Sequence, residues 1–223
     1  MAVTTNSRAT GTIQKPCGGE RASGRRRRAR PGAGLARAAL FCVLFWLCVL
    51  ITAGTALAGE TFTYDGTNPP LQKAPDPAET PNSLFAGTTA NPVASGNTIT
   101  IDFNAGTSPA RVFGGISNTG DSAGNTVHML RGTITSRIYG GYGGDVGSAV
   151  GNTVIMSGGN VADRVVGGHS INGDATGNSV TMSGGTAQSL FGGTVGDTGH
   201  ATGTSVTMTG GTAGSISGGS ASA

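Results

Sequence analysis

Two kinds of charged residue recur along the second half of this chain, and either could do chemistry. Four aspartates each follow a glycine: Asp121, Asp145, Asp174 and Asp197. Three arginines each precede two apolar residues and a glycine pair: Arg111, Arg137 and Arg164. Carboxylates can act as general acids or bases. Like charges stacked about 4.8 Å apart repel unless they are paired. Asp102, Asp121 and Asp163 are the possible partners of the arginines.

The spacing of these charges favours a structural role over catalysis. An arginine row beside an aspartate row resembles the exposed groups of polysaccharide-cleaving β-helix enzymes. Those enzymes gather their acids in one unique cluster, whereas here the acids recur once per repeat. An aspartate in a turn commonly accepts backbone hydrogen bonds. We therefore predict no catalytic residue and no enzyme, with a polysaccharide-active β-helix enzyme as the alternative.

The metal-binding patterns in the chain are incomplete. Residues 140–145, Gly-Gly-Tyr-Gly-Gly-Asp, fit the opening of a calcium-binding nonapeptide, but Gly147 stands where a large apolar residue belongs. A calcium site also needs six or more oxygen ligands. His128, His169 and His200 fall at different positions of the repeat, and we expect exposed polar roles for them. We predict no metal and no cofactor, and keep a calcium-stabilised repeat as a further alternative.

The element that must position these residues is a block of about 26 residues that occurs five times, and a fixed period of this size is typical of solenoids. Its leading glycines are almost evenly spaced, at Gly96, Gly124, Gly151, Gly177 and Gly203. After each glycine, apolar residues alternate with polar ones, as in Val154 and Met156, which indicates a strand with one buried face. We predict an all-β fold, a parallel β-helix of about five coils.

Two further positions in the block predict how the coils stack. An aliphatic residue before each glycine pair, such as Val112 or Ile138, is predicted to face inward, and the variable residue after it outward. The glycine pairs are interpreted as turn glycines. Equivalent residues of successive coils lie above one another, so an asparagine column can pass amide hydrogen bonds from coil to coil. The predicted ladder consists of Asn97, Asn125, Asn152 and Asn178, and it ends at Thr204.

The segment 1–58 has the pattern of a secretory signal. A cluster of arginines precedes a twelve-residue apolar run at 40–51, and Ala56 and Ala58 match a cleavage site before Gly59. Twelve residues span only about 18 Å as a helix, although counting from 38 to 58 leaves a signal anchor as the alternative. We predict a signal peptide at 1–58, a proline-rich lead-in or cap at 59–93, and the β-solenoid at 94–223.

The charge of the chain changes sign after the leader. From Gly59 onward there are five basic and ten acidic residues, a net charge of −5, and no basic patch. Nucleic acid is therefore excluded as a partner. All three cysteines precede Gly59, so the remaining chain has no disulfide or thiolate zinc site.

The leader and the repeated Gly-Asn-x-Val-x-Met and Val-x-Gly-Gly lines resemble the passenger regions of bacterial autotransporters and related adhesins. The resemblance covers residues 94–223 and implies a secreted or cell-surface stalk, at the outer membrane, that binds host or bacterial glycans or proteins. Such proteins end in a membrane barrel, whereas this sequence ends within a repeat. We expect a piece of a longer protein or another secretion route, with membrane contact only through the leader or a missing barrel.

Overall fold

The computed structural model describes residues 59–75 and 78–221. The predicted signal segment, with Ala56 and Ala58, lies outside these residues. Within the described residues, all regular secondary structure consists of β-strands. That part of the chain contains no helix long and apolar enough to cross a membrane.

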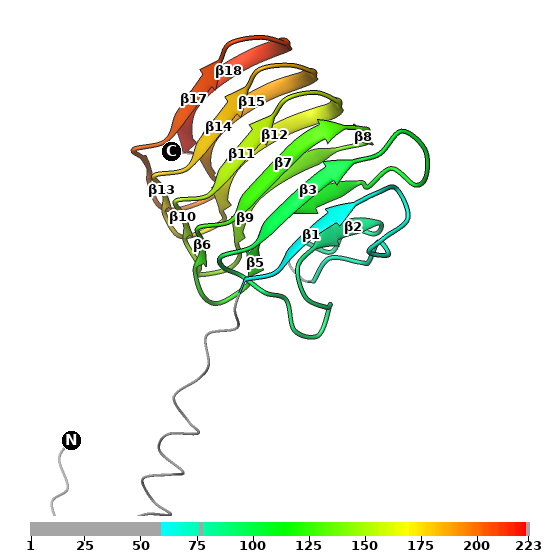
Figure 1. The fold of residues 1–223 in the computed structure, drawn as a ribbon. Helices are drawn as coiled ribbons and strands as arrows, with labels where there is room; N and C mark the ends of the chain where they lie inside the picture. Colours follow the sequence, from blue (N-terminus) through cyan, green and yellow to red (C-terminus); the bar gives the residue numbers. More distant parts are fainter. Residues whose placement is uncertain (1–58, 76–77, 222–223) are drawn as a thin grey trace, which may run out of the picture. The chain divides into compact units, whose positions relative to one another are not determined.

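The described strands form three parallel sheets, and the chain visits them in turn (Figure 1). The six-stranded sheet contains, in spatial order, β1 (Thr61–Tyr64), β3 (Thr98–Asp102), β7 (Thr126–Arg131), β11 (Thr153–Met156), β14 (Ser179–Met182) and β17 (Ser205–Met208). The four-stranded sheet contains β6 (Ser122–Ala123), β10 (Ala149–Val150), β13 (Ala175–Thr176) and β16 (Ala201–Thr202).

The eight-stranded sheet has the longest strands and positions the candidate site. Its main path is β2 (Ser83–Phe85), β4 (Arg111–Phe113), β9 (Arg137–Gly143), β12 (Asn160–Ser170), β15 (Thr186–Val195) and β18 (Thr212–Ala221). Two short strands complete it: β5 (Ile116–Ser117), which pairs with β9, and β8 (Thr133–Ile134), which pairs with β12.

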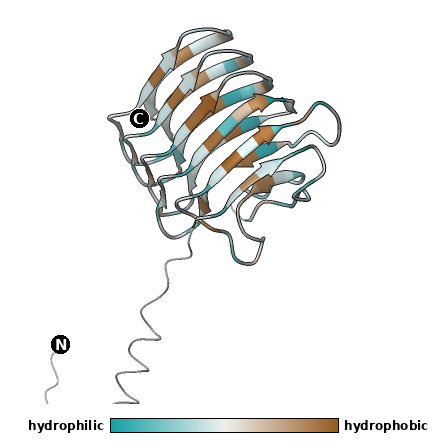
Figure 2. Cartoon of the chain, viewed as in Figure 1, coloured by the Kyte–Doolittle hydropathy of each residue, from teal (hydrophilic) through white to brown (hydrophobic). Residues whose placement is uncertain are grey.

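Strand pairing places each repeat directly on the next. Val154 of β11 pairs with Val127 on one side and Val180 on the other. Met156 pairs in the same way with the methionines of the neighbouring coils. Apolar bands therefore recur at equivalent points of successive strands, as Figure 2 shows. The predicted all-β parallel β-helix, with about five coils and the period of the sequence repeat, is confirmed.

The lead-in also contributes strands to the solenoid. β1, at Thr61–Tyr64, pairs with β3. β2 pairs with β4 through Leu84 and Val112. Part of the lead-in thus forms an incomplete coil ahead of the first repeat.

The coil interior is a continuous apolar core. The alternating apolar side chains of the six-stranded sheet, Ile in β3 and Val and Met afterwards, are almost completely buried from β3 to β14. They face the aliphatic side chains of the eight-stranded sheet, Leu84, Val112, Ile138, Val165 and Leu190. In the last coil the equivalent residue, Ile216, is 52% exposed. Each coil therefore buries its apolar residues on its neighbours, and among the described residues nothing covers the outer side of the last coil.

The glycines of the repeat have two separate roles. The leading glycines adopt φ values between +61° and +72°, which a residue with a side chain rarely adopts. The glycine pairs do not; Gly140–Gly141 lie in β9 and Gly167–Gly168 in β12. A methyl group on Gly141 or Gly168 would overlap the side chain of Asn152 or Asn178. The interpretation of these pairs as turn glycines is wrong: they are needed for close approach of the asparagine column.

Candidate functional site

The four predicted ladder asparagines lie in one fully buried column. Asn97 Nδ2 donates to Asn125 Oδ1 at 2.8 Å, and Asn125 Nδ2 donates to Asn152 Oδ1 at 2.8 Å. Asn152 Nδ2 donates to Asn178 Oδ1 at 3.0 Å. Each acceptor oxygen also receives the backbone N–H of the preceding asparagine. At the end of the column, the Thr204 hydroxyl donates to the carbonyl oxygen of Gly218.

The aspartates that follow glycine lie in exposed turns between the four-stranded and eight-stranded sheets. Asp121 Oδ1 accepts the backbone N–H of Ser148 at 3.0 Å, and Asp174 Oδ1 accepts that of His200 at 2.8 Å. Asp197 is tied to the preceding coil through its backbone N–H. Asp145 lies in an exposed bend. These carboxylates are spread one per coil, and Asp121 and Asp174 each bond to the backbone of the next coil.

The calcium-like motif is divided between two structural elements. Gly140 to Gly143 belong to strand β9, and the ring of Tyr142 is buried against Phe113 and Tyr139. Asp145 lies beyond the strand end. In the described part of the chain, no three His, Cys, Asp or Glu side chains gather closely enough to hold a metal ion.

Two of the three arginines share one carboxylate partner, Asp163. Asp163 pairs with Arg137, and its other oxygen lies 3.4 Å from Arg164 Nε. Asp102, a possible partner of the arginine row, pairs instead with Arg131 of β7, whose hydrogen bond lowers the pKa of Asp102. Arg111 reaches the carbonyl oxygen of Ala78 at 3.5 Å. The row is therefore neutralised only in part.

The outer face of the eight-stranded sheet carries a column of mostly aromatic side chains. They stand at the variable position of the repeat that is predicted to face outward. This ring column, in register from coil to coil, is Phe85, Phe113, Tyr139, Val166 and Phe191, followed by Ser217. The rings of Phe113 and Tyr139 stack with centroids 5.3 Å apart. The first four members are almost completely buried, so outward-pointing residues here form a second apolar cluster instead of a polar surface.

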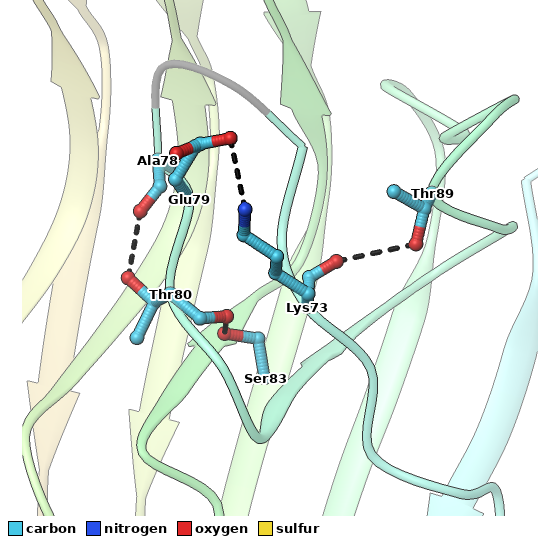
Figure 3. A network of polar contacts seen from close by, with 6 residues as sticks. All are labelled: Lys73, Ala78, Glu79, Thr80, Ser83 and Thr89. Atoms are coloured by element: carbon cyan, nitrogen blue, oxygen red, sulfur yellow. Dashed lines mark hydrogen bonds and ion pairs between the residues drawn. The ribbon is translucent and has the colours of Figure 1, made fainter.

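Part of the lead-in covers the N-terminal end of this column. In this covering segment, residues 71–75 and 78–82, Ala74 and Ala78 pack into the second apolar cluster. Figure 3 shows the polar contacts that fix it. Lys73 Nζ lies 3.0 Å from Glu79 Oε1, and Thr89 Oγ1 donates to the Lys73 carbonyl at 3.2 Å. The Thr80 hydroxyl donates to the Ala78 carbonyl within the segment, and the Ser83 hydroxyl of β2 donates to the Thr80 carbonyl. The lead-in therefore packs along the side of the solenoid as well as at its end.

Beyond the covering segment lies a hollow of about 220 Å³. We call it the outer hollow. It is lined by Arg137, Tyr139, Arg164, Val166, His169, Phe191, Thr194, Val195, Gly196 and Ser220. The Arg164 guanidinium carbon lies 5.8 Å from the centre of the Phe191 ring. The hollow combines cations, a ring face and hydroxyl groups, and is therefore the candidate binding site of this chain.

His169 lines the outer hollow and is partly buried beside two aromatic rings. Its ring centre is 5.0 Å from that of Tyr142 and 5.7 Å from that of Tyr139. Its Nδ1 lies 2.8 Å from Thr194 Oγ1. Burial first, and then the nearby Arg137, Arg164 and Arg111, lower the pKa of His169 to about 4. The expectation of an exposed role is wrong for His169, whereas His200 is exposed.

This environment predicts a pH dependence of stability. The ordinary pKa of histidine is about 6.5, so between pH 6.5 and 4 the unfolded chain binds a proton that the folded chain does not. The free energy of unfolding should therefore fall by about 1–2 kcal/mol from His169 alone between pH 7 and pH 5. Urea unfolding of the wild type and of His169→Gln at both pH values measures this contribution. An equal loss in both proteins would contradict it.

The ring column and the outer hollow were missed from the sequence. The signal was present, because Phe113, Tyr139 and Phe191 recur at one position of the repeat. Their variation to Val166 and Ser217 favoured a solvent-facing interpretation. The sequence does not show that the covering segment packs on this column, because residues 71–82 carry no repeat pattern that would align them with it.

In comparisons with protein-family models, curated proteins and solved structures, nothing matched this chain. The β-solenoid itself is established by the strand pairing. The resemblance to autotransporter passengers depends on the sequence lines alone.

Proposed function

We propose that this chain is a secreted or cell-surface repeat module, a non-catalytic stalk that also binds a partner, like the passenger regions of bacterial adhesins. The observation that carries the proposal is how the polar residues of the repeat are used. The buried asparagines bond from coil to coil, and so do the turn aspartates Asp121 and Asp174. These residues maintain an architecture and leave the outer surface for binding.

The arrangement of carboxylates supports a binding role over polysaccharide cleavage. Glycosidases place two carboxyl groups about 5–9.5 Å apart on either side of one bond. Asp121 and Asp174 are each committed to a backbone N–H of the next coil. Asp163 is paired with Arg137 and Arg164, which both line the outer hollow. A carboxylate held in this way stabilises arginine positions and is poorly suited to proton transfer.

Export of the chain is the test of this function. The full chain, with a C-terminal epitope tag, should leave the cytoplasm of a Gram-negative host and begin at Gly59. Cell fractionation and N-terminal mass spectrometry measure both features. A matched variant, Ala58→Leu, places a large side chain at the predicted cleavage site and should accumulate with its leader attached.

Retention of the wild type in the cytoplasm would overturn the secreted assignment. Export with the leader still attached would favour the signal anchor over the cleaved signal peptide. The distinction does not depend on any ligand, so it is separate from the binding test below.

A further inference from the structure

The outer hollow lies where the ring column is interrupted at one position. Val166 pairs in register with Tyr139 on one side and with Phe191 on the other. Among the preceding coils, Phe113 and Tyr139 stack without a gap of this kind. A valine is smaller than either ring, and Val166, although almost completely buried, forms part of the lining of the hollow. The hollow is thus a departure from the repeat, whereas most polar groups of the chain follow it.

Two guanidinium groups border this space, and they differ in how many of their hydrogen-bond donors are already engaged. Arg137 is held by Asp163 and by the Tyr139 hydroxyl, 3.2 Å from Arg137 Nη1. Although burial opposes it, these bonds raise the pKa of Arg137 above its ordinary value. Arg164 touches Asp163 only through Nε, and its Nη atoms have no hydrogen-bond partner within the described residues. Arg164 therefore presents a fork of two donors beside the hollow.

The local charge makes the outer hollow distinct from the rest of the mature chain. Arg137 and Arg164 share the single carboxylate of Asp163, and Arg111 lies close enough to affect His169. Because its pKa is lowered, the neighbouring His169 is neutral at pH 7. The site therefore carries net positive charge on a chain whose residues from Gly59 onward sum to −5.

We propose that the outer hollow binds the carboxylate-bearing sugar ring of an acidic polysaccharide. The Arg164 fork and the remaining donors of Arg137 would hold the carboxylate, since guanidinium groups match its geometry in a bidentate way. The partly buried ring of Phe191 offers a face for the apolar side of the sugar ring. Thr194 and Ser220 line the same hollow and supply hydroxyl groups. This inference rests on the proposed binding function and names its ligand class.

The lining of the hollow favours a saccharide over an acidic peptide. Ser, Thr and Gly predominate where the eight-stranded sheet continues beyond the hollow, with Ser189 and Ser215 joined by a 2.8 Å hydrogen bond between their hydroxyls. This surface matches a hydroxyl-rich polymer that continues along the strands. It offers no second apolar pocket of the kind that would receive a peptide side chain in the residues that line the hollow.

The test uses the full chain, purified in mild detergent, and fluorescently labelled trigalacturonate as the probe. Fluorescence anisotropy should detect binding of trigalacturonate but not of its methyl ester, which has the same rings without the charge. Arg164→Gln should weaken binding by about tenfold or more, the usual effect of losing a charge-assisted hydrogen bond. Val166→Phe should weaken binding, because a larger side chain at this lining position narrows the hollow. Its circular dichroism should remain that of the wild type.

Arg131→Gln is the matched control, because Arg131 pairs with Asp102 on the six-stranded sheet, away from the hollow. Binding unaffected by Arg164→Gln, or weakened equally by Arg131→Gln, would overturn the site. Equal binding of acid and ester, or no binding at all, would overturn the ligand class. Competition by polyglutamate as strong as that by unlabelled trigalacturonate would point to an acidic peptide and also overturn it. Should Val166→Phe misfold, the comparison of Arg164→Gln with Arg131→Gln decides alone.

Discussion

Asn152→Ala is expected to lower the free energy of unfolding by about 3–5 kcal/mol, because it opens the ladder in the middle of the stack. Asn152 Oδ1 accepts both the backbone N–H and the Nδ2 of Asn125. Its own Nδ2 donates to the Ser122 carbonyl and to Asn178. All these atoms belong to buried residues. An unsatisfied buried donor or acceptor costs about 1–3 kcal/mol, and alanine leaves more than one.

Urea unfolding followed by circular dichroism measures this loss. Asn152 is preferable to Asn97 because end coils of a solenoid can fray without unfolding the whole stack. The matched control adds an amide instead of removing one. Thr204→Asn continues the column by one coil, next to Asn178, and should leave stability unchanged or raise it by about 1 kcal/mol. A loss below about 1 kcal/mol in Asn152→Ala would show that the column contributes little.

Features that the repeat copies could be predicted from sequence, because each copy reports the same environment. The apolar pair, Ile and Ile in the first block and Val and Met in the other four, has period two in every block, which fixes its buried face. An asparagine at one position in four successive blocks implies a column, since equivalent residues of parallel coils stack. The period alone was thus sufficient to predict the fold class, the inward residues and the stacking of Asn97, Asn125, Asn152 and Asn178.

Features that depend on contacts between non-equivalent positions could not be predicted. The ring column is buried because the covering segment packs on it, and that segment belongs to the lead-in. Val166 looks like ordinary variation until its neighbours in register, Tyr139 and Phe191, are known. The pKa of His169 is lowered by burial beside the rings of another coil, Tyr139 and Tyr142, and by the nearby arginines. In each case the decisive partner lies at a different position of the block or outside the repeats.

The glycines also show that a residue's structural role cannot always be predicted from its type. A glycine can be required for a positive φ or for close approach, and composition does not separate the two. Gly177 has a φ of +64°, and a methyl group there would meet nothing within 4 Å. Gly168 has ordinary strand geometry, but a methyl group would overlap the amide of Asn178. The difference depends on which surface each glycine faces.

Gly168→Ala is therefore expected to destabilise the fold by about 3–4 kcal/mol, and Gly177→Ala by less. Asn178 cannot move away from the added methyl group without losing the hydrogen bonds from its Nδ2 to the Ala149 carbonyl and from Asn152 to its Oδ1. Overpacking in a rigid core costs about 1–3 kcal/mol, and a broken buried hydrogen bond adds to it. Gly177→Ala meets only the strain of the left-handed region, about 1–2 kcal/mol. Urea unfolding of the two variants measures the difference.

A double-mutant cycle separates overlap with the ladder from a general loss of packing. Asn178→Ala removes the side chain that Gly168→Ala would overlap, so the double variant should be more stable than the sum of the single effects predicts, by at least about 1 kcal/mol. The same cycle with Gly177→Ala should be closer to additive, since that methyl group reaches no side chain. Additive losses for Gly168→Ala and Asn178→Ala would mean that the glycine pair has another role. Coupling between them would make the glycine pairs and the asparagines one structural unit, which explains why both recur in the same blocks of the sequence.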